Sequence, residues 1–307
     1  MHDTLSLIFN EAFLTTIVRV GVPLMFASMS AYVAHVGGLP NIAGEGIMLM
    51  SALFGVLGSY WTQNAFLGLL IAVVIGVAMA LLLAFMNIKL GANAFLVGIA
   101  LNTFASSFTI FLLYICAGSK GFSASLDSKI LPNLKFEWMA DIPVLRAILY
   151  DQHILVYACF ACMIIIPWLI YKTPYGLRLR ATGYNEKAAE TLGVGTSKMR
   201  VSALAISGLL ASLGGAYMTM GYLSAFTADM IAGRGWIGFA AQAMGGNSFI
   251  GLTLTTLGFS IFQAIVAVFS RVNVSSDLLS IVPYAGVLFG VIGFSVVIYM
   301  RNKKNNQ

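Results

Sequence analysis

Long apolar segments alternate with shorter polar ones along the whole chain. Eight of them have the roughly 20 mostly apolar residues that a helix needs to cross a bilayer. These eight cover approximately residues 12–34, 42–61, 65–85, 94–117, 154–171, 203–222, 249–270 and 278–300. A ninth segment, residues 228–244, is shorter and rich in glycine, and we expect it to be re-entrant or tilted. The pattern predicts an all-α polytopic membrane protein with eight or nine transmembrane helices.

Composition supports a single transmembrane domain over residues 1–307. The chain is 59% hydrophobic and only 9% charged, whereas a soluble domain averages about 25% charged residues. The three cysteines lie within or beside apolar runs. Cys159 and Cys162 have the spacing C-x-x-C but no second ligand pair, so we expect neither a metal site nor a redox site.

The charges of the loops predict the orientation. The loop at residues 172–202 holds six Lys or Arg residues and the tail after Met300 holds three, whereas the loop at residues 118–152 balances four basic residues with four acidic ones. Cytoplasmic loops carry an excess of Lys and Arg. We therefore place the first loop and the C-terminus in the cytoplasm and loop 118–152 outside. The N-terminus is outside if there are nine spans and inside if there are eight.

The basic loop contains the pattern of a short helix between the fifth and sixth spans. Four residues at i, i+3, i+4 and i+7 share one face, namely Asn185, Ala188, Ala189 and Leu192. The charged residues Glu186, Lys187 and Glu190 are expected on the opposite face. Gly193 can end the helix in the left-handed conformation. Such a small, weakly apolar face suits docking into a groove on another protein, although a helix lying on the membrane surface has the same pattern.

Glu45 is the one acidic residue well inside an apolar run. A charge at mid-membrane costs roughly 2.5–3.5 kcal/mol on insertion scales, so the carboxyl group is expected to face the bundle interior. Nearby Gly and Pro residues predict an interrupted helix there. Glu45 could belong to a pathway or gate, or it could tie helices together with Asn41. Arg19 is a candidate partner for a carboxylate, but we favour the interpretation that it reaches toward lipid headgroups.

A polar stripe is predicted on the fourth span, where Asn102, Ser106 and Thr109 recur at i, i+4 and i+7. The stripe could line an aqueous path for a neutral solute, or it could join helices by hydrogen bonds. With Asn41 and Glu45, these three residues are the candidate translocation pathway.

Three common sequence motifs of ATPases, metalloenzymes and hydrolases are not found in the sequence. It has no G-x-x-x-x-G-K-[ST] loop to cradle ATP phosphates, no H-E-x-x-H metal motif and no G-x-S-x-G elbow. We therefore expect no catalytic residue and no metal ligand, and ATP-driven transport would need a separate ATPase.

Three blocks of sequence carry a resemblance to a known family. They are GGLPNIAGEGIML at residues 37–49, the pattern R-x-x-G-x-N-x-x-A-A-x-x-x-G at residues 180–193, and GRGWIGFAAQAMGGN at residues 233–247. Together they resemble the permease subunits of ABC importers in the branched-chain amino acid and ribose permease superfamily. Within it, the chain is most similar to the nucleoside permeases that work with basic-membrane-protein lipoproteins.

The resemblance implies the function and the partners. The chain would be the permease of an ATP-driven nucleoside importer in a bacterial cell membrane. It would work with a second, related permease, a cytoplasmic ATPase that binds ATP and Mg²⁺, and an extracellular lipoprotein. No cofactor on this chain and no nucleic acid are expected. The family's coupling positions match Gly183, Asn185, Ala188, Ala189 and Gly193, and Glu45 matches its acidic residue.

Other functions remain open at this point. Sugar and branched-chain amino acid permeases share the coupling loop. A secondary transporter would use an ion gradient instead of ATP, and a scaffold protein would transport nothing.

Overall fold

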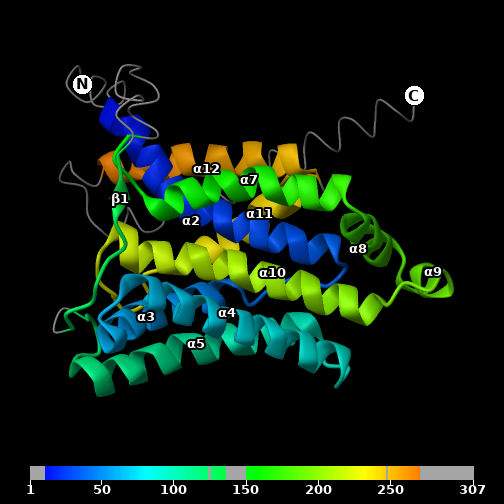
Figure 1. Cartoon of the computed structure of the whole chain (residues 1–307), viewed down its shortest axis with the longest axis horizontal. Coiled ribbons are helices and arrows are strands. Elements are labelled where there is room, and N and C mark those ends of the chain that lie inside the picture. The colour runs from blue at the N-terminus through cyan, green and yellow to red at the C-terminus, as the bar shows by residue number, and fades with distance from the viewer. Residues whose placement is uncertain (1–10, 124–125, 136–149, 247, 270–307) are drawn as a thin grey trace.

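The computed structural model describes residues 11–123, 126–135, 150–246 and 248–269. Helices dominate these ranges, and most of the long ones run roughly along the long axis of the molecule, with α2 crossing obliquely (Figure 1). Six of the described helices are long and apolar enough to cross a membrane. They are α2 (Glu11–Val36), α4 (Ala65–Ile88), α5 (Ala94–Ala117), α7 (Ile154–Lys172), α10 (Thr196–Tyr217) and α12 (Phe249–Phe269).

Two further helices belong to the bundle without meeting these criteria. Helix α3 (Gly44–Thr62) is buried by its neighbours from Gly46 to Ser59, with Phe54 half-buried, and its last turn is exposed. Helix α11 (Arg234–Met244) has 11 residues, which gives a length of about 16 Å at 1.5 Å per residue, about half of the hydrocarbon core. Of the expected ninth segment, residues 228–244, only residues 234–244 form this helix, and its re-entrant or tilted course stays a prediction. The predicted span at residues 278–300 lies outside the described residues, so the total of eight or nine spans stays a prediction.

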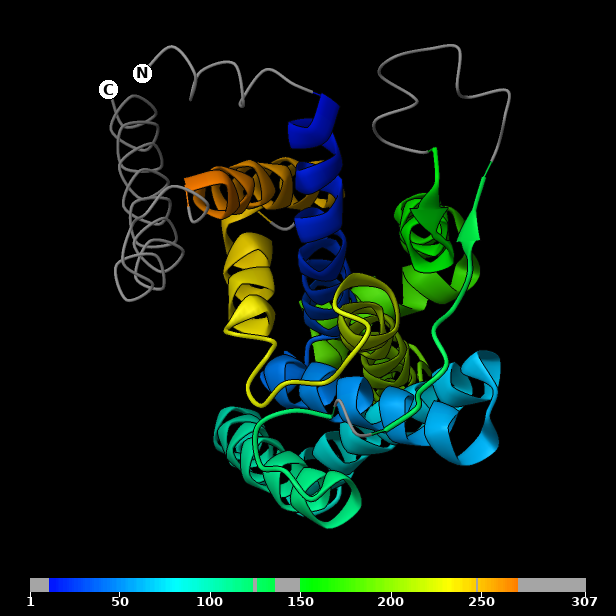
Figure 2. The same ribbon diagram turned by 90° about the vertical axis from the view of Figure 1, so that its left-hand side faces the viewer.

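Helices α2 and α10 occupy the centre of the bundle. Helix α2 packs against α7, α10, α11 and α12, while α10 also packs against α3 and α4. Figure 2, an end-on view, shows α3, α4 and α5 on one side of this centre and α11 and α12 on another. One apolar cluster lies around α3, α4 and α5, and a second lies around α2, α7 and α10.

Small residues let these helices approach closely. A Cβ atom added at Gly215 of α10 would lie 2.1 Å from the carbonyl oxygen of Met48 on α3, and one added at Gly208 would lie 2.6 Å from the Cβ atom of Ala80 on α4. Without water to drive association, membrane helices gain from such close backbone packing.

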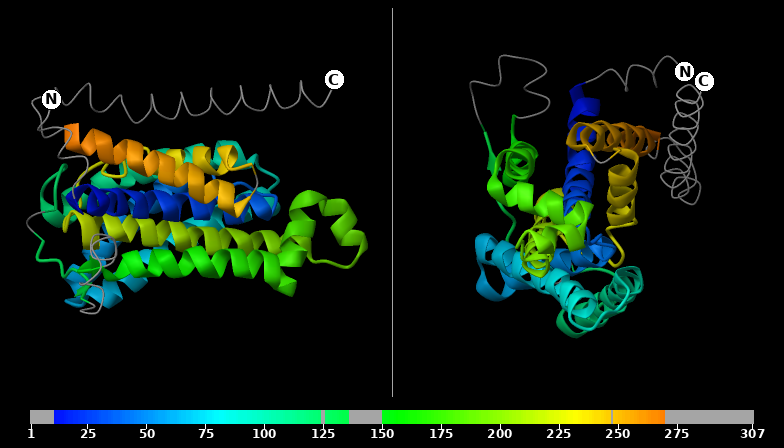
Figure 3. Two further views of the ribbon diagram at one scale, coloured as in Figure 1. Left: turned by 90° about the horizontal axis from the view of Figure 1, so that it is seen from above. Right: turned by 90° about the vertical axis from the view of Figure 1, so that its right-hand side faces the viewer.

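The two ends of the bundle differ. Helices α8 (Pro174–Tyr184) and α9 (Glu186–Thr191) extend beyond the other described helices at one end (Figures 1 and 3). At the other end, strands β1 (Asn133–Leu134) and β2 (Gln152–His153) pair antiparallel, with Asn133 opposite His153. Helix α7 connects the two ends, and α2 begins at the strand end. The two long polar loops are therefore separated by one span, as the charge pattern predicts.

Candidate functional site

The turn between α2 and α3, residues 37–43, is held by buried polar contacts. Asn41 is 3% exposed. Its Nδ2 atom donates to Oγ of Ser207 on α10 at 2.9 Å, and its Oδ1 atom accepts from the N–H of Ala43 at 3.0 Å. The Oγ atom of Ser207 also lies 2.8 Å from Oγ of Ser30 on α2. Asn41 therefore ties the turn to two helices.

Asn102 holds the same turn from α5. Its Oδ1 atom accepts from the N–H of Gly46 at 2.8 Å, and its Nδ2 atom donates to the carbonyl oxygen of Ile42 at 2.9 Å. One amide thus satisfies a donor at the start of α3 and an acceptor in the turn before it. Unpaired backbone groups would be costly in this environment.

Glu45, in the first turn of α3, caps another helix. Its Oε1 atom accepts from the N–H of Gly233 at 2.8 Å, and its Oε2 atom accepts from the N–H of Gly235 at 2.7 Å. The first N–H groups of a helix have no partner within it and carry the positive end of the helix dipole. A carboxylate is therefore well suited to the start of α11. We call these two contacts the Glu45 cap.

Glycine is required on the α11 side of the Glu45 cap. A Cβ atom added at Gly235 would lie 2.5 Å from the backbone nitrogen of Glu45. Gly233 has a φ of +78°, a left-handed conformation that other residues rarely adopt. The cap thus brings together residues from two sequence blocks that are separated by most of the chain.

Arg19 has a different environment. It borders a polar cavity of about 90 Å³ at the strand end, together with Asn133, Asp151, Gln152, His153, Tyr217, Gly221 and Tyr222. Among the described residues, Arg19 forms no ion pair with Glu45. The hydrogen bonds from Gly233 and Gly235 to Glu45 take the place of the carboxylate–arginine pair that the sequence also allowed.

His153 is a buried member of this cavity. Its Nδ1 atom accepts from the N–H of Leu155 at 3.2 Å and so caps the start of α7. Burial lowers the pKa of His153 to about 4. The imidazole is therefore neutral at pH 7, as an accepting Nδ1 atom requires.

The rest of the predicted polar stripe is arranged differently from Asn102. Thr109 is fully buried, and its hydroxyl donates to the carbonyl oxygen of Ser106 at 3.0 Å. The Ser106 side chain is half-buried. Asn41, Glu45 and Asn102 thus gather around one turn, whereas Ser106 and Thr109 lie further along α5.

The basic loop folds into two helices that are capped by its own side chains. The Oγ1 atom of Thr173 accepts from the N–H of Gly176 at 3.2 Å at the start of α8. The Oδ1 atom of Asn185 accepts from the N–H of Ala188 at 3.1 Å at the start of α9. Gly193, with a φ of +79°, follows α9 in the left-handed conformation that the sequence predicts.

The predicted orientation of α9 is wrong for Ala189. We expected Ala188 and Ala189 to face outward together, but Ala189 is only 3% exposed and Ala188 is exposed. The cause lies in the charged face of the helix, because Glu186 pairs with Arg200 and Glu190 accepts from Thr196 at 2.6 Å. These contacts hold that side of α9 against the start of α10.

The outward surface of the loop is therefore a different set from the one expected. It includes Tyr184, which is 96% exposed, and Leu192, which is 82% exposed, with Ala188 between them. We call these three residues, which lie on α9 and just before and after it, the outer face of α9.

Gly183 has a packing role that the sequence pattern around it does not reveal. A Cβ atom added there would lie 2.1 Å from the carbonyl oxygen of Val36, and the Cα atom of Gly183 lies 2.9 Å from the place where a Cβ atom on Gly38 would stand. The end of α8 therefore rests directly on the end of α2. The glycines at positions 38 and 183 were visible in two separate blocks, but nothing local paired them.

Comparison with known proteins covers nearly the whole chain. Residues 13–297 match the family model described as branched-chain amino acid transport system / permease component. The nucleoside ABC transporter permease protein NupC of Lactococcus lactis subsp. cremoris is 30% identical over 275 residues, which is 85% of each chain. The guanosine ABC transporter permease protein NupQ of Bacillus subtilis is 29% identical over 285 residues, 89% of this chain and 88% of its own.

More distant proteins match as well. The glucose ABC transporter permease protein TsgB13 of Haloferax volcanii is 26% identical over 260 residues, 81% of this chain and 67% of its own. Among solved structures, PsaBC from Streptococcus pneumoniae in complex with a Fab aligns over 94% of both chains, with a TM-score of 0.55 at 14% identity. At that identity, the likeness concerns the fold alone.

Proposed function

Because the chain belongs to the branched-chain amino acid transport system / permease component family, we propose that it is the permease subunit of an ATP-driven importer for nucleosides. The likeness to a nucleoside permease over 85% of both chains is the observation that carries this proposal. The guanosine permease, at nearly the same identity and greater coverage of this chain, supports the same class of solute.

The cytoplasmic loop supports coupling to a separate ATPase. Helices α8 and α9 extend past the bundle (Figure 3), and the outer face of α9 offers a small and partly apolar surface. Of the five coupling positions, Asn185 caps the start of α9, Ala188 lies on its outer face, and Ala189 is buried on its inner side. Gly183 and Gly193 shape the two ends of this segment. The loop is thus a rigid projection with a surface free to enter a groove.

The polar groups of the turn suit a neutral solute. Asn41 and Asn102 contribute amides, and the Glu45 carboxylate is engaged by the start of α11. We propose that this turn lies along the pathway, which the chain forms with a second, related permease. An extracellular lipoprotein would deliver the nucleoside at the strand end, and ATP and Mg²⁺ would bind only to the ATPase. Glu11, the first residue of α2, then lies on the outer side, because α2 begins at the strand end.

Reconstituted transport tests this function. The permease, its partner permease, the ATPase and the lipoprotein would be placed in liposomes with labelled guanosine. We expect uptake that requires ATP and is inhibited by adenosine, uridine or cytidine. Inhibition by glucose or leucine alone would contradict the nucleoside assignment. Uptake driven by an ion gradient without the ATPase would favour a secondary transporter.

A sugar is the second candidate solute. The glucose permease matches 81% of this chain at 26% identity, which is lower than the two nucleoside-class relatives. The same competition experiment separates the two.

A further inference from the structure

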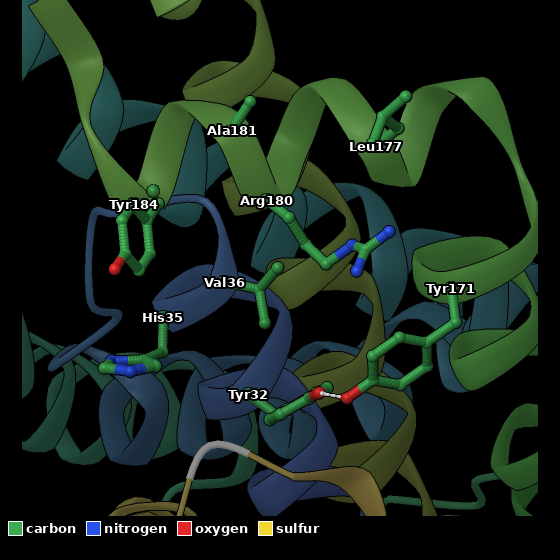
Figure 4. Close-up of a pocket in the computed structure, with 9 residues that line it drawn as sticks. Tyr32, His35, Val36, Tyr171, Leu177, Arg180, Ala181 and Tyr184 are labelled. Carbon is green, nitrogen blue, oxygen red and sulfur yellow. Dashed lines mark hydrogen bonds between the residues drawn. The ribbon is translucent and has the colours of Figure 1, made fainter. Parts of the chain in front are cut away.

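An open cavity of about 600 Å³ lies at the α8 end of the bundle and shares Tyr184 with the outer face of α9. It is formed by the last turns of α2 and α7 and by one side of α8. Figure 4 shows Arg180 pointing from α8 toward Tyr171, with His35 and Tyr184 further along the cavity. Three tyrosines, one arginine and one histidine therefore meet where two spans end.

Contacts between side chains join the floor of the cavity. The hydroxyl groups of Tyr32 and Tyr171 lie 2.5 Å apart in a hydrogen bond between α2 and α7. The guanidinium carbon of Arg180 lies 5.4 Å from the centre of the Tyr171 ring, a cation–π contact. The ring holds the guanidinium in place without neutralising its charge.

Arg180 has no counterion within the described residues. The ion pairs there join Lys129 with Asp127, Lys135 with Asp151, and Arg200 with Glu186. Two further cations, Lys172 and Arg178, are exposed on the same segment. The cavity thus presents an oriented, unpaired cation in basic surroundings, which is complementary to an anion.

An apolar track leads from α7 to this cation. Ile164, Trp168 and Tyr171 are exposed at i, i+4 and i+7, which places them on one face of α7, and Tyr171 is the residue beneath Arg180. On a membrane-spanning helix, such a face contacts acyl chains. Aromatic residues near its end are typical of the headgroup level.

We propose that this cavity binds the headgroup of an anionic phospholipid such as phosphatidylglycerol. The planar guanidinium of Arg180 would hold the phosphate by two parallel hydrogen bonds, a geometry that arginine favours. An acyl chain would lie along Ile164 and Trp168. Basic pockets between helices on the cytoplasmic side are suited to such headgroups. A phospholipid would contact both the cation and the apolar track. A soluble acidic partner would contact the cation alone, so the presence of the track favours the lipid.

Native mass spectrometry of the assembled importer tests the site. The purified complex is titrated with phosphatidylglycerol or with zwitterionic phosphatidylcholine, and bound lipids are counted. We expect Arg180→Gln to weaken the tightest phosphatidylglycerol site about tenfold, because charge-assisted bonds to phosphate are lost. Tyr171→Leu keeps the charge but removes the ring that orients it, so a weaker loss in the same direction is expected.

Arg178→Gln is the matched control, because Arg178 is an exposed arginine of the same helix that does not line the cavity. It should change binding by no more than about fivefold, the scale of one basic residue near an anionic surface, and less than Arg180→Gln does. Equal losses in both arginine variants, unchanged binding in Arg180→Gln, or equal retention of phosphatidylcholine would each overturn the proposal. Release of the ATPase by Arg180→Gln with the lipid still bound would instead assign the cavity to that protein.

Discussion

The Oε2 atom of Glu45 accepts a hydrogen bond of 2.7 Å from the backbone N–H of Gly235, a residue 190 positions further along the chain. With the second bond to Gly233, this contact joins the first turn of α3 to the first turn of α11. Two of the three family blocks thus meet at one carboxylate.

The first prediction concerns this carboxylate. Glu45→Gln keeps one accepting oxygen and should retain part of the transport activity. Glu45→Leu leaves both N–H groups of α11 without this partner, which should cost on the order of 1–3 kcal/mol for each buried group. Uptake and thermal unfolding of the two variants would be compared at equal expression. Full uptake by both would mean that Glu45 is dispensable.

The second prediction concerns the glycine opposite it. Gly235→Ala places a Cβ atom 2.5 Å from the backbone nitrogen of Glu45, so α11 must move away. We expect a loss of about 1–3 kcal/mol of stability, as for other overpacked contacts, together with reduced uptake. Gly258→Ala on α12 is the control, since an added Cβ atom there meets nothing within 4 Å. Similar behaviour of the two alanine variants would argue against the close contact.

The third prediction separates the two alanines of α9. Ala188→Trp adds a large side chain to the outer face and should leave the permease folded. It should weaken binding of the ATPase about 5- to 150-fold, the equivalent of 1–3 kcal/mol. Ala189→Trp should instead disturb the loop itself, because Ala189 is buried.

Co-purification of the ATPase and ATP-driven uptake check this prediction, with Ala188→Ser as the conservative control. Normal coupling in Ala188→Trp would remove α9 from the docking surface.

The fourth prediction concerns topology. In a variant without its own cysteines, Ser197→Cys should be labelled only from the cytoplasm and Ser128→Cys only from outside. Ser197 is chosen because it is exposed, whereas the neighbouring Thr196 is buried and bonded to Glu190. Labelling of both cysteines from one side would contradict the single span between them.

The fifth prediction is a loss of stability in acid through His153. Its pKa is about 4 when folded, because of burial, and about 6.5 when unfolded. The unfolded chain therefore binds more protons between these values, and stability falls as the pH drops from about 6.5 to about 4. At about 1.4 kcal/mol per pKa unit, the loss is on the order of 3 kcal/mol. Above pH 7 this contribution is constant.

Thermal unfolding at a series of pH values measures the effect. The other titratable groups at the cavity are Arg19, Asp151, Tyr217 and Tyr222, so the comparison with His153→Gln isolates the histidine. An unchanged acid slope in that variant would assign the effect to another group.

The sequence predicted the elements that are defined by local patterns. The bounds of α5, residues 94–117, agree with the apolar run, because Asn93 caps its start and Gly118 follows its end in the left-handed conformation. The short helix α9 and its glycine stop were likewise predicted, since capping depends on residues a few positions apart.

What the sequence could not give were contacts between distant residues. The spacing of Ala188 and Ala189 says that they are neighbours on a helix, but not which of them turns inward. That choice is made by Glu186 and Arg200, which lie 14 positions apart. The partner of Glu45 was hidden for the same reason, because an N–H group without a partner leaves no trace in the residue type.

The contact of Gly183 with the end of α2 has a mechanical consequence. Backbone touches backbone there, with no side chain between them to change rotamer and absorb a displacement. A displacement of α8 toward α2 would therefore shift the segment around Val36 and Gly38. That segment leads within a few residues to Asn41 and Glu45, so this backbone contact would transmit a displacement of α8 directly to the start of α3.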